Sequence, residues 1–258
     1  MELIGITLLQ AEKFFIVLAR VAAVVAVIPI FGHQAVPPRL RIGLAVFLSI
    51  IIFPLAPGVP ENVSLTIGQF FVALFQSVCV GLAISFFVIL IFAGVQFGGE
   101  IAGFEMGFSI ISVIDPLSSS RMSLITQFQY IFSLLIFLVL DGHLFLIQGL
   151  VESFRTAPLL GVHFVPASAN QLIRATSNIF VIGVKISAPI MVATLLAKVG
   201  LGILARTMPQ LNVFIVGFPL QIGIGLITLV LSMPIFFYTF QKLWSGYQID
   251  WFRFIRLF

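Results

Sequence analysis

The fold of this chain is decided by the stretch Arg206-Thr207-Met208-Pro209-Gln210-Leu211-Asn212-Val213-Phe214-Ile215-Val216-Gly217-Phe218-Pro219, a polar, proline-bounded break between two long apolar segments. Proline lacks a backbone donor and disfavours helix in the residue before it. We therefore expect Pro209 to end one helix and Pro219 to open the next at a first-turn position, which makes a helical hairpin. The break is interpreted either as a plain interhelical turn or as a surface that a partner recognises. The residues assigned to this partner-docking turn are Arg206, Pro209, Gln210, Asn212, Phe214 and Gly217.

The composition places the chain in or beside a lipid bilayer. Hydrophobic residues make up 60% and charged residues 9% of the sequence, with a mean hydropathy of +1.22, whereas soluble domains carry about 25% charged residues. The net charge of +4 is spread thinly, without a run of five basic residues, which argues against nucleic-acid binding. Cys79 is the only cysteine, so an intrachain disulfide is excluded.

Six apolar segments approach or exceed the ~20 residues that cross a bilayer core of roughly 30 Å. We therefore predict an all-α membrane protein with about six long apolar helices, an irregular Gly/Pro-rich loop and a C-terminal helical hairpin. The uneven segment lengths favour packing in a protein assembly. A boundary near Pro166 divides a helical N-terminal part (1–165) from the hairpin and tail (166–258). The apolar segments are Leu8–Phe31, Leu40–Leu55, Ile67–Gln96, Met122–Leu140, Leu172–Ala205 and Leu220–Leu243.

Between the fourth and fifth segments, residues 142–165 form a shorter amphipathic stretch that carries Glu152 and Arg155. Amphipathic helices of this kind lie in the interface plane of a membrane. We expect this stretch to lie along a surface.

Glycines recur at nearly four-residue spacing in the third segment and just after it. This spacing predicts a single helical face on which another backbone approaches closely. The helix-packing glycines are Gly94, Gly98, Gly99, Gly103 and Gly107.

Ionisable residues also interrupt the apolar segments. One ionised group at the centre of a membrane helix costs roughly 2.5–3.5 kcal/mol on insertion scales. Two interpretations remain open, namely structural pairing between helices or subunits and a path for ions or protons. The residues concerned are Arg20, Glu100, Glu105, Asp115, Lys185 and Lys198.

The segment Phe104–Pro116 is bulky and apolar, yet glycine, serine and proline interrupt it. Irregular backbone at membrane depth is tolerated only where it is buried in protein or lines a cavity, and a hydrophobic constriction seals a pore by excluding water. We therefore predict a loop that plugs a channel. Its candidate sealing residues are Phe104, Met106, Phe108, Ile110, Ile111, Val113, Ile114 and Pro116.

No catalytic or metal-binding pattern is present in the sequence. His33, His143 and His163 are far apart, and none belongs to a His-Glu-x-x-His arrangement. Asp141-Gly142-His143 is interpreted as a capping turn in preference to a general base with its orienting acid. We expect neither an enzyme nor a cofactor.

Several sequence blocks together resemble the FliR family of flagellar export proteins and its injectisome relatives. The blocks occur in the same order as in the family and cover essentially the whole chain. The block Pro209–Phe214 is specific for the family. The blocks are Pro209-Gln210-Leu211-Asn212-Val213-Phe214, Gly217-Phe218-Pro219, Pro29-Ile30-Phe31-Gly32, Val36-Pro37-Pro38-Arg39-Leu40-Arg41, and Asp141-Gly142-His143 after Gln127-Phe128.

The resemblance implies a subunit of the type III export gate in the bacterial inner membrane and flagellar basal body. Such a subunit is assembled with FliP and FliQ, contacts FlhB and passes unfolded flagellar proteins. The resemblance further implies that residues 1–165 are FliP-like, that residues 166–258 are a FliQ-like hairpin, and that residues 104–116 occupy the position of the family's plug loop.

Three alternatives remain at this level. The cargo can be that of an injectisome instead of a flagellum. A proton-coupled secondary transporter would use a broken helix near Gly98–Gly107 with Glu100 and Glu105, although the two inverted halves typical of such transporters are not found. A purely structural scaffold would need no plug.

Overall fold

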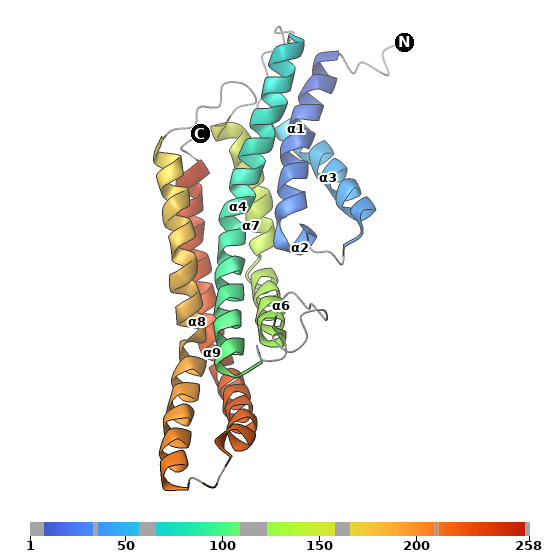
Figure 1. Cartoon of the computed structure of the whole chain (residues 1–258). Coiled ribbons are helices and arrows are strands. Elements are labelled where there is room, and N and C mark those ends of the chain that lie inside the picture. Colours follow the sequence, from blue (N-terminus) through green and yellow to red (C-terminus); the bar gives the residue numbers. More distant parts are fainter. Residues whose placement is uncertain are drawn as a thin grey trace. The chain divides into compact units, whose positions relative to one another are not determined.

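The computed structural model describes residues 8–32, 36–56, 66–108, 123–157, 166–208, 210 and 212–255. Every regular element in these ranges is helical, which confirms the all-α fold (Figure 1). In chain order the elements are α1 (Leu8–Val27), α2 (Pro29–Gly32), α3 (Pro38–Ile52), the 3₁₀ turn η1 (Phe53–Leu55), α4 (Ile67–Glu105), α6 (Leu124–Val139), α7 (Gly142–Thr156), α8 (Pro166–Thr207) and α9 (Val213–Ile255).

Within these ranges, four segments are long and apolar enough to cross a membrane, fewer than the six that the sequence predicted. They are Pro38–Leu55, Ile67–Glu105, Asn170–Thr207 and Ile215–Phe254. Helices α6 and α7, joined by a short break, make a fifth if the two together are counted as one span. The stretch expected to lie along a surface is thus mainly the second helix of this pair. Helix α1 is absent from the set because Glu12, Lys13 and Arg20 lie within its 20 residues.

Local signals in the sequence account for several helix ends. Helix α4 begins after Thr66, whose backbone N and hydroxyl both donate to Gln69 Oε1, at 3.0 and 2.8 Å. This Thr-x-x-Gln arrangement resembles a capping box. Helix α6 begins after Ser123, whose hydroxyl accepts a hydrogen bond from Thr126 N.

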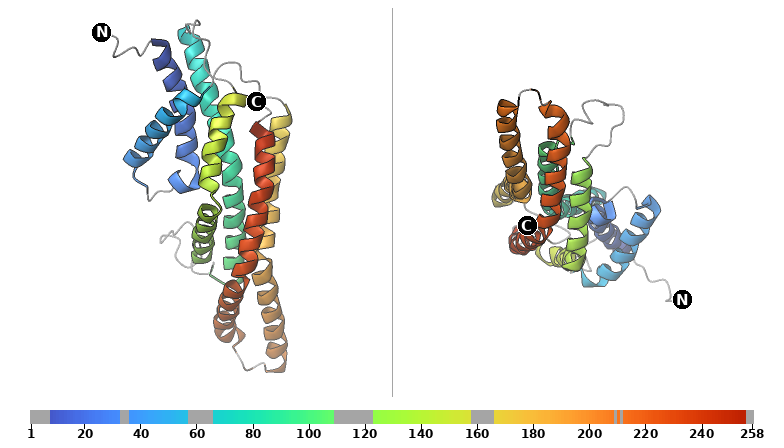
Figure 2. Two further views of the ribbon diagram at one scale, coloured as in Figure 1. Left: turned by 180° about the vertical axis from the view of Figure 1, so that it is seen from behind. Right: turned by 90° about the horizontal axis from the view of Figure 1, so that it is seen from below.

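The C-terminal hairpin is present, but one of its predicted boundaries is wrong. Helix α8 ends at Thr207, ahead of Pro209 as expected, whereas α9 begins at Val213 and contains Pro219 in its interior. The first turn of α9 forms before Pro219, because Asn212 O already accepts from the backbone N of Ile215 and Val216. Figures 1 and 2 show α8 and α9 side by side and antiparallel.

The chain groups into two compact units. Unit 1 comprises residues 1–90, 141–175 and 246–258, and unit 2 comprises residues 91–140 and 176–245. Both units therefore combine N-terminal and C-terminal sequence. The boundary at Pro166 was drawn between a FliP-like part and a FliQ-like part of the sequence. The compact units do not test that resemblance, so the boundary stays a prediction.

Unit 1 is held by contacts of α4 and α7 with the end of α9. The indole of Trp251 lies where a side chain at Gly149 would be, and Trp251 Nε1 donates to Ile84 O at 3.4 Å. Phe87 stacks on Phe254, with ring centroids 5.1 Å apart. These aromatic side chains form the core that fixes the end of α9 within the unit.

In unit 2 the predicted glycines bring α4 close to its neighbours on two faces. Towards α8, a Cβ placed on Gly98 would lie 2.8 Å from the carbonyl oxygen of Gly183. Towards α6, a Cβ placed on Gly99 would lie 2.6 Å from Thr126 Cα. Gly94 also faces α8 and Gly103 faces α6. Gly94, Gly98, Gly99 and Gly103 therefore serve two seams and do not form the single face that the spacing suggested, and Gly107 lies beyond α4 and faces Phe218.

The Gly98 seam predicts a sharp dependence on side-chain size. Gly98→Val forces two backbones apart, and overpacking of this kind costs about 1–3 kcal/mol. We expect a lowered thermal midpoint for the purified protein in detergent. Gly223→Ala is the matched control, because nothing lies within 4 Å of a Cβ at that position. Equal midpoints for Gly98→Val and Gly223→Ala would contradict the close approach.

Candidate functional site

The C-terminal end of α4, in unit 2, gathers several of the residues singled out in the sequence. Glu100, Glu105 and Met106 lie here, and the helix ends in a tight turn in which Gly107 N donates to Phe104 O and Phe108 N donates to Gly103 O. Gly107 has a φ of +90°, a conformation that favours glycine. The turn is therefore built into the sequence at this position.

Glu100 joins the end of α4 to the start of α6. Its Oε1 atom accepts from Ser123 N at 3.2 Å and from Thr126 Oγ1 at 2.8 Å. A carboxylate at a helix N-terminus also interacts favourably with the helix dipole. The negative charge of Glu100 is thus stabilised by polar groups at the first turn of α6.

Glu105 joins α4 to α8. Lys198 Nζ lies 2.6 Å from Glu105 Oε2, and Thr194 Oγ1 lies 3.3 Å from the same oxygen. The side chains are partly buried, with exposed fractions of 38% for Lys198 and 23% for Glu105. Pairing with an opposite charge lowers the cost of placing either charge in an apolar helix. The two residues thus satisfy each other within one chain.

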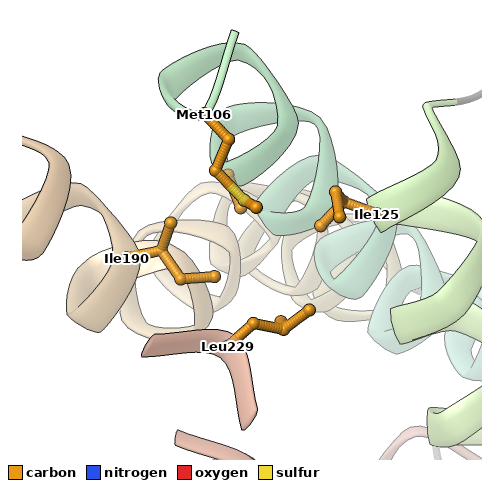
Figure 3. Close-up of a cluster of buried hydrophobic side chains, with 5 residues drawn as sticks. Met106, Ile125, Ile190 and Leu229 are labelled. Atoms are coloured by element: carbon orange, nitrogen blue, oxygen red, sulfur yellow. The ribbon is translucent and has the colours of Figure 1, made fainter. Parts of the chain in front are cut away.

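Met106 anchors the same end of α4 in the apolar core (Figure 3). Its side chain is fully buried and meets Ile125 of α6, Ile190 of α8 and Leu229 of α9. A Cβ on Gly225 would overlap the Met106 side chain, so α9 also approaches through a glycine. Met106 therefore packs between helices of its own chain. The sequence had suggested that it projects from a loop, and this is not what the structure shows.

Of the other candidate sealing residues, the structure describes only Phe104 and Phe108. Phe104 lies on α4 and is 69% exposed, whereas Phe108 packs against the Met106 cluster. Ile110, Ile111, Val113, Ile114, Asp115 and Pro116 lie outside the described residues.

Arg20 is buried in unit 1, and no acid in the described ranges pairs with it. Its Nη1 atom donates to the carbonyl oxygens of Ser153 at 2.8 Å and Ala157 at 2.9 Å, at the C-terminal end of α7. Its guanidinium lies 4.3 Å from the centre of the Phe154 ring. Cations at a helix C-terminus satisfy the last carbonyls and interact favourably with the dipole. The charge of Arg20 is therefore balanced by a helix end and an aromatic face.

Lys185 differs from Arg20, Glu100, Glu105 and Lys198. It is exposed on α8, and the described part of the chain places no acid within ion-pair distance of its ammonium group. Sequence reasoning did not distinguish it from Lys198, because the distinction depends on which face of α8 meets α4.

The predicted docking turn lies at the tip of the hairpin in unit 2. Arg206, Gln210 and Asn212 are exposed, whereas Gly217 is buried against Leu201. Asn212 supplies the carbonyl that starts α9. Pro209 and the side chain of Phe214 lie outside what the structure describes.

Asp141-Gly142-His143 forms the junction between α6 and α7. Asp141 has a φ of 54°, and its carbonyl accepts from Leu144 N and Phe145 N. The geometry is that of a helix-starting turn. No group of three or more metal-ligating side chains occurs in the ranges that the structure covers.

Together these features define a class of protein, a helical membrane protein whose conspicuous charges stabilise helix contacts. The comparisons identify the family. The model for bacterial export proteins, family 1, matches residues 11–247, so the chain belongs to this family.

The relatives are flagellar biosynthetic proteins named FliR. The one from Bacillus subtilis (strain 168) is 36% identical over 243 residues, covering 90% of each chain. The one from Escherichia coli (strain K12) is 34% identical over 224 residues, covering 86% of this chain and 84% of the relative. The one from Aquifex aeolicus (strain VF5) is 30% identical over 252 residues, covering 96% and 95%. The predicted resemblance and the assignment to flagellar protein export are confirmed by these matches.

The Glu105–Lys198 pair predicts a measurable coupling. In a double-mutant cycle with Glu105→Gln and Lys198→Met, we expect an interaction energy of roughly 0.5–3 kcal/mol, because the residues are in contact and partly desolvated. Denaturant unfolding in detergent measures it. The exposed pair Glu152–Arg155 is the matched control, with about 0.2–1 kcal/mol expected. Additive effects of the two substitutions would show that the short distance carries no stabilisation.

Proposed function

We propose that this chain is a non-enzymatic subunit of the flagellar type III export gate in the bacterial inner membrane. It assembles with FliP and FliQ, contacts FlhB, and lets unfolded flagellar proteins pass, with residues 1–165 FliP-like and residues 166–258 FliQ-like. The observation that carries the proposal is the low burial of the longest helices in a member of an export family. The most apolar windows of the α8 and α9 spans are only 33% and 22% buried, against 61% in α4.

The arrangement of the acids favours a gate over a proton-coupled transporter. A coupling carboxylate must exchange protons with water during each cycle, which requires a polar pathway. Glu105 is committed to Lys198 and Glu100 to the first turn of α6. Both contacts stabilise helix packing, as a subunit that must hold its shape beside a moving polypeptide requires.

The segment 104–116 is proposed as the plug of the resting channel. Its start is fixed by Met106 in the core, and the polar cluster of Glu100, Ser123 and Thr126 lies where the chain enters α6. The apolar residues of the segment supply the seal, since an apolar constriction excludes water and ions.

Removal of the plug predicts leakage. Deletion of residues 109–116 in the assembled gate should raise ion conductance by at least roughly tenfold, since the dewetted barrier is lost. Planar-bilayer recordings of the purified complex measure this conductance. A Gly/Ser replacement of equal length controls for shortening and should leak as well. Unchanged conductance in a correctly assembled deletion would remove the plug from the proposal.

The exposed tip of the hairpin is proposed to dock FlhB. Gln210 and Asn212 are exposed there beside Ile215, which is 71% exposed. An apolar side chain beside polar amides offers a partner both contact area and hydrogen bonds.

Affinity purification of the tagged chain from native membranes tests both the assembly and the tip. The unaltered chain should recover FliP, FliQ and FlhB. If the chain is purified without any of these proteins, the proposed function is contradicted. Gln210→Ala with Asn212→Ala should reduce FlhB by roughly tenfold, a loss of about 1.4 kcal/mol, while FliP and FliQ remain. Thr207→Ala on the preceding turn of α8 is the control. Full recovery of FlhB with the double variant would exclude the tip as its docking site.

A further inference from the structure

Helix α8 has two unlike faces in unit 2. One face packs on α4, where Ile182 meets Gly94 and where Gly183 and Ile186 meet Gly98. The opposite face is exposed along several turns. Its residues recur in an i, i+3, i+4, i+7 pattern, which places them in one stripe. The stripe consists of Val181, Val184, Lys185, Val192, Leu195 and Val199.

The charge of Lys185 is the exception in this apolar stripe. The valines and the leucine are between 49% and 59% exposed, and Lys185 is exposed among them. It lies inside the membrane-span segment Asn170–Thr207. A charge within such a span needs a partner or a route to water. Lys198, further along the same helix, has Glu105, and the described residues offer Lys185 no equivalent.

A second polar group lies at the same level of α8. Pro189 lies inside the helix, and proline has no N–H to donate to the carbonyl four residues earlier. That carbonyl belongs to Lys185. Helix α8 therefore has, at a single residue, a cation that no acid of the described residues neutralises and a carbonyl that lacks its regular helical donor.

Lipid alone does not satisfy both groups. Lysine can extend its ammonium towards an interface, but hydrocarbon offers the Lys185 carbonyl no donor, and unsatisfied backbone groups are avoided in lipid. A second copy of the hairpin fits poorly as well. Helix α8 contains no Asp or Glu, and the only acid of α9, Asp250, lies 3.7 Å from Arg253.

We propose that the outer face of α8 binds a membrane-spanning helix of a different subunit, and that this helix places a carboxylate against the ammonium of Lys185. The partner helix is otherwise apolar, and it carries a hydroxyl or amide donor within a turn of its acid for the Lys185 carbonyl. This inference rests on the proposed function, which supplies such subunits, and adds to it the chemistry of one contact.

Site-specific photo-cross-linking in native membranes tests the contact. A photoreactive amino acid replaces Val184 or Val192, on either side of Lys185 in the stripe, and cross-linked peptides are sequenced by mass spectrometry. Both positions should cross-link to one subunit, in a peptide that contains Asp or Glu. Lys185→Met should lower the yield by at least roughly tenfold, and Lys185→Arg should retain it. Lys242→Met, at an exposed lysine of α9, should have no effect.

Charge exchange provides the decisive result. Lys185→Glu should abolish the cross-link, and replacement of the partner's acid by lysine should restore it. Adducts to lipid only, adducts to a second copy of this chain, or an unchanged yield with Lys185→Met would each overturn the inference. If FliP, FliQ and FlhB still co-purify in that case, only this contact is wrong. If the chain purifies alone and cross-links to no other subunit, the proposed function fails with it.

Discussion

The close approach of α4 to α8 and α6 through glycine is the constraint on which the unit 2 core depends. Only a residue without a side chain lets α4 come so near to Gly183 on one face and Thr126 on the other. That approach brings Glu105 within ion-pair distance of Lys198 and places Met106 among Ile125, Ile190 and Leu229. The polar contacts at the end of α4 are therefore consequences of how its backbone packs.

Charge in this apolar chain is balanced by three different means. Arg20 uses the carbonyl end of α7, Glu100 the first turn of α6, and Glu105 the ammonium of Lys198. Each reduces the cost of an ionised group away from water. Lys185 is the contrast, because its helix turns it away from α4. A chain that stabilises Arg20, Glu100 and Glu105 internally and leaves Lys185 on an apolar face is what a subunit of a larger membrane assembly would need.

Much of the fold followed from local sequence, whereas the pairings did not. Apolar lengths and the Pro209 break predicted the helical class and the hairpin, and the order of short sequence blocks predicted the family. Pro219 was misjudged because the first turn of α9 is already formed from Asn212, so proline is tolerated further in. The partners of Arg20 and Lys198 depend on tertiary packing across more than ninety residues. Spacing alone could not show that the glycines divide between two faces.

Export itself is the most direct measurement of the central claim, that this chain completes a passage for flagellar proteins. The source bacterium is deprived of the chain, and filament protein is measured outside the cell and in the cytoplasm. Filament protein should then stay in the cytoplasm, and re-expression of the chain should restore its release. Normal release of filament protein in the absence of the chain would show that the chain is not needed for the passage.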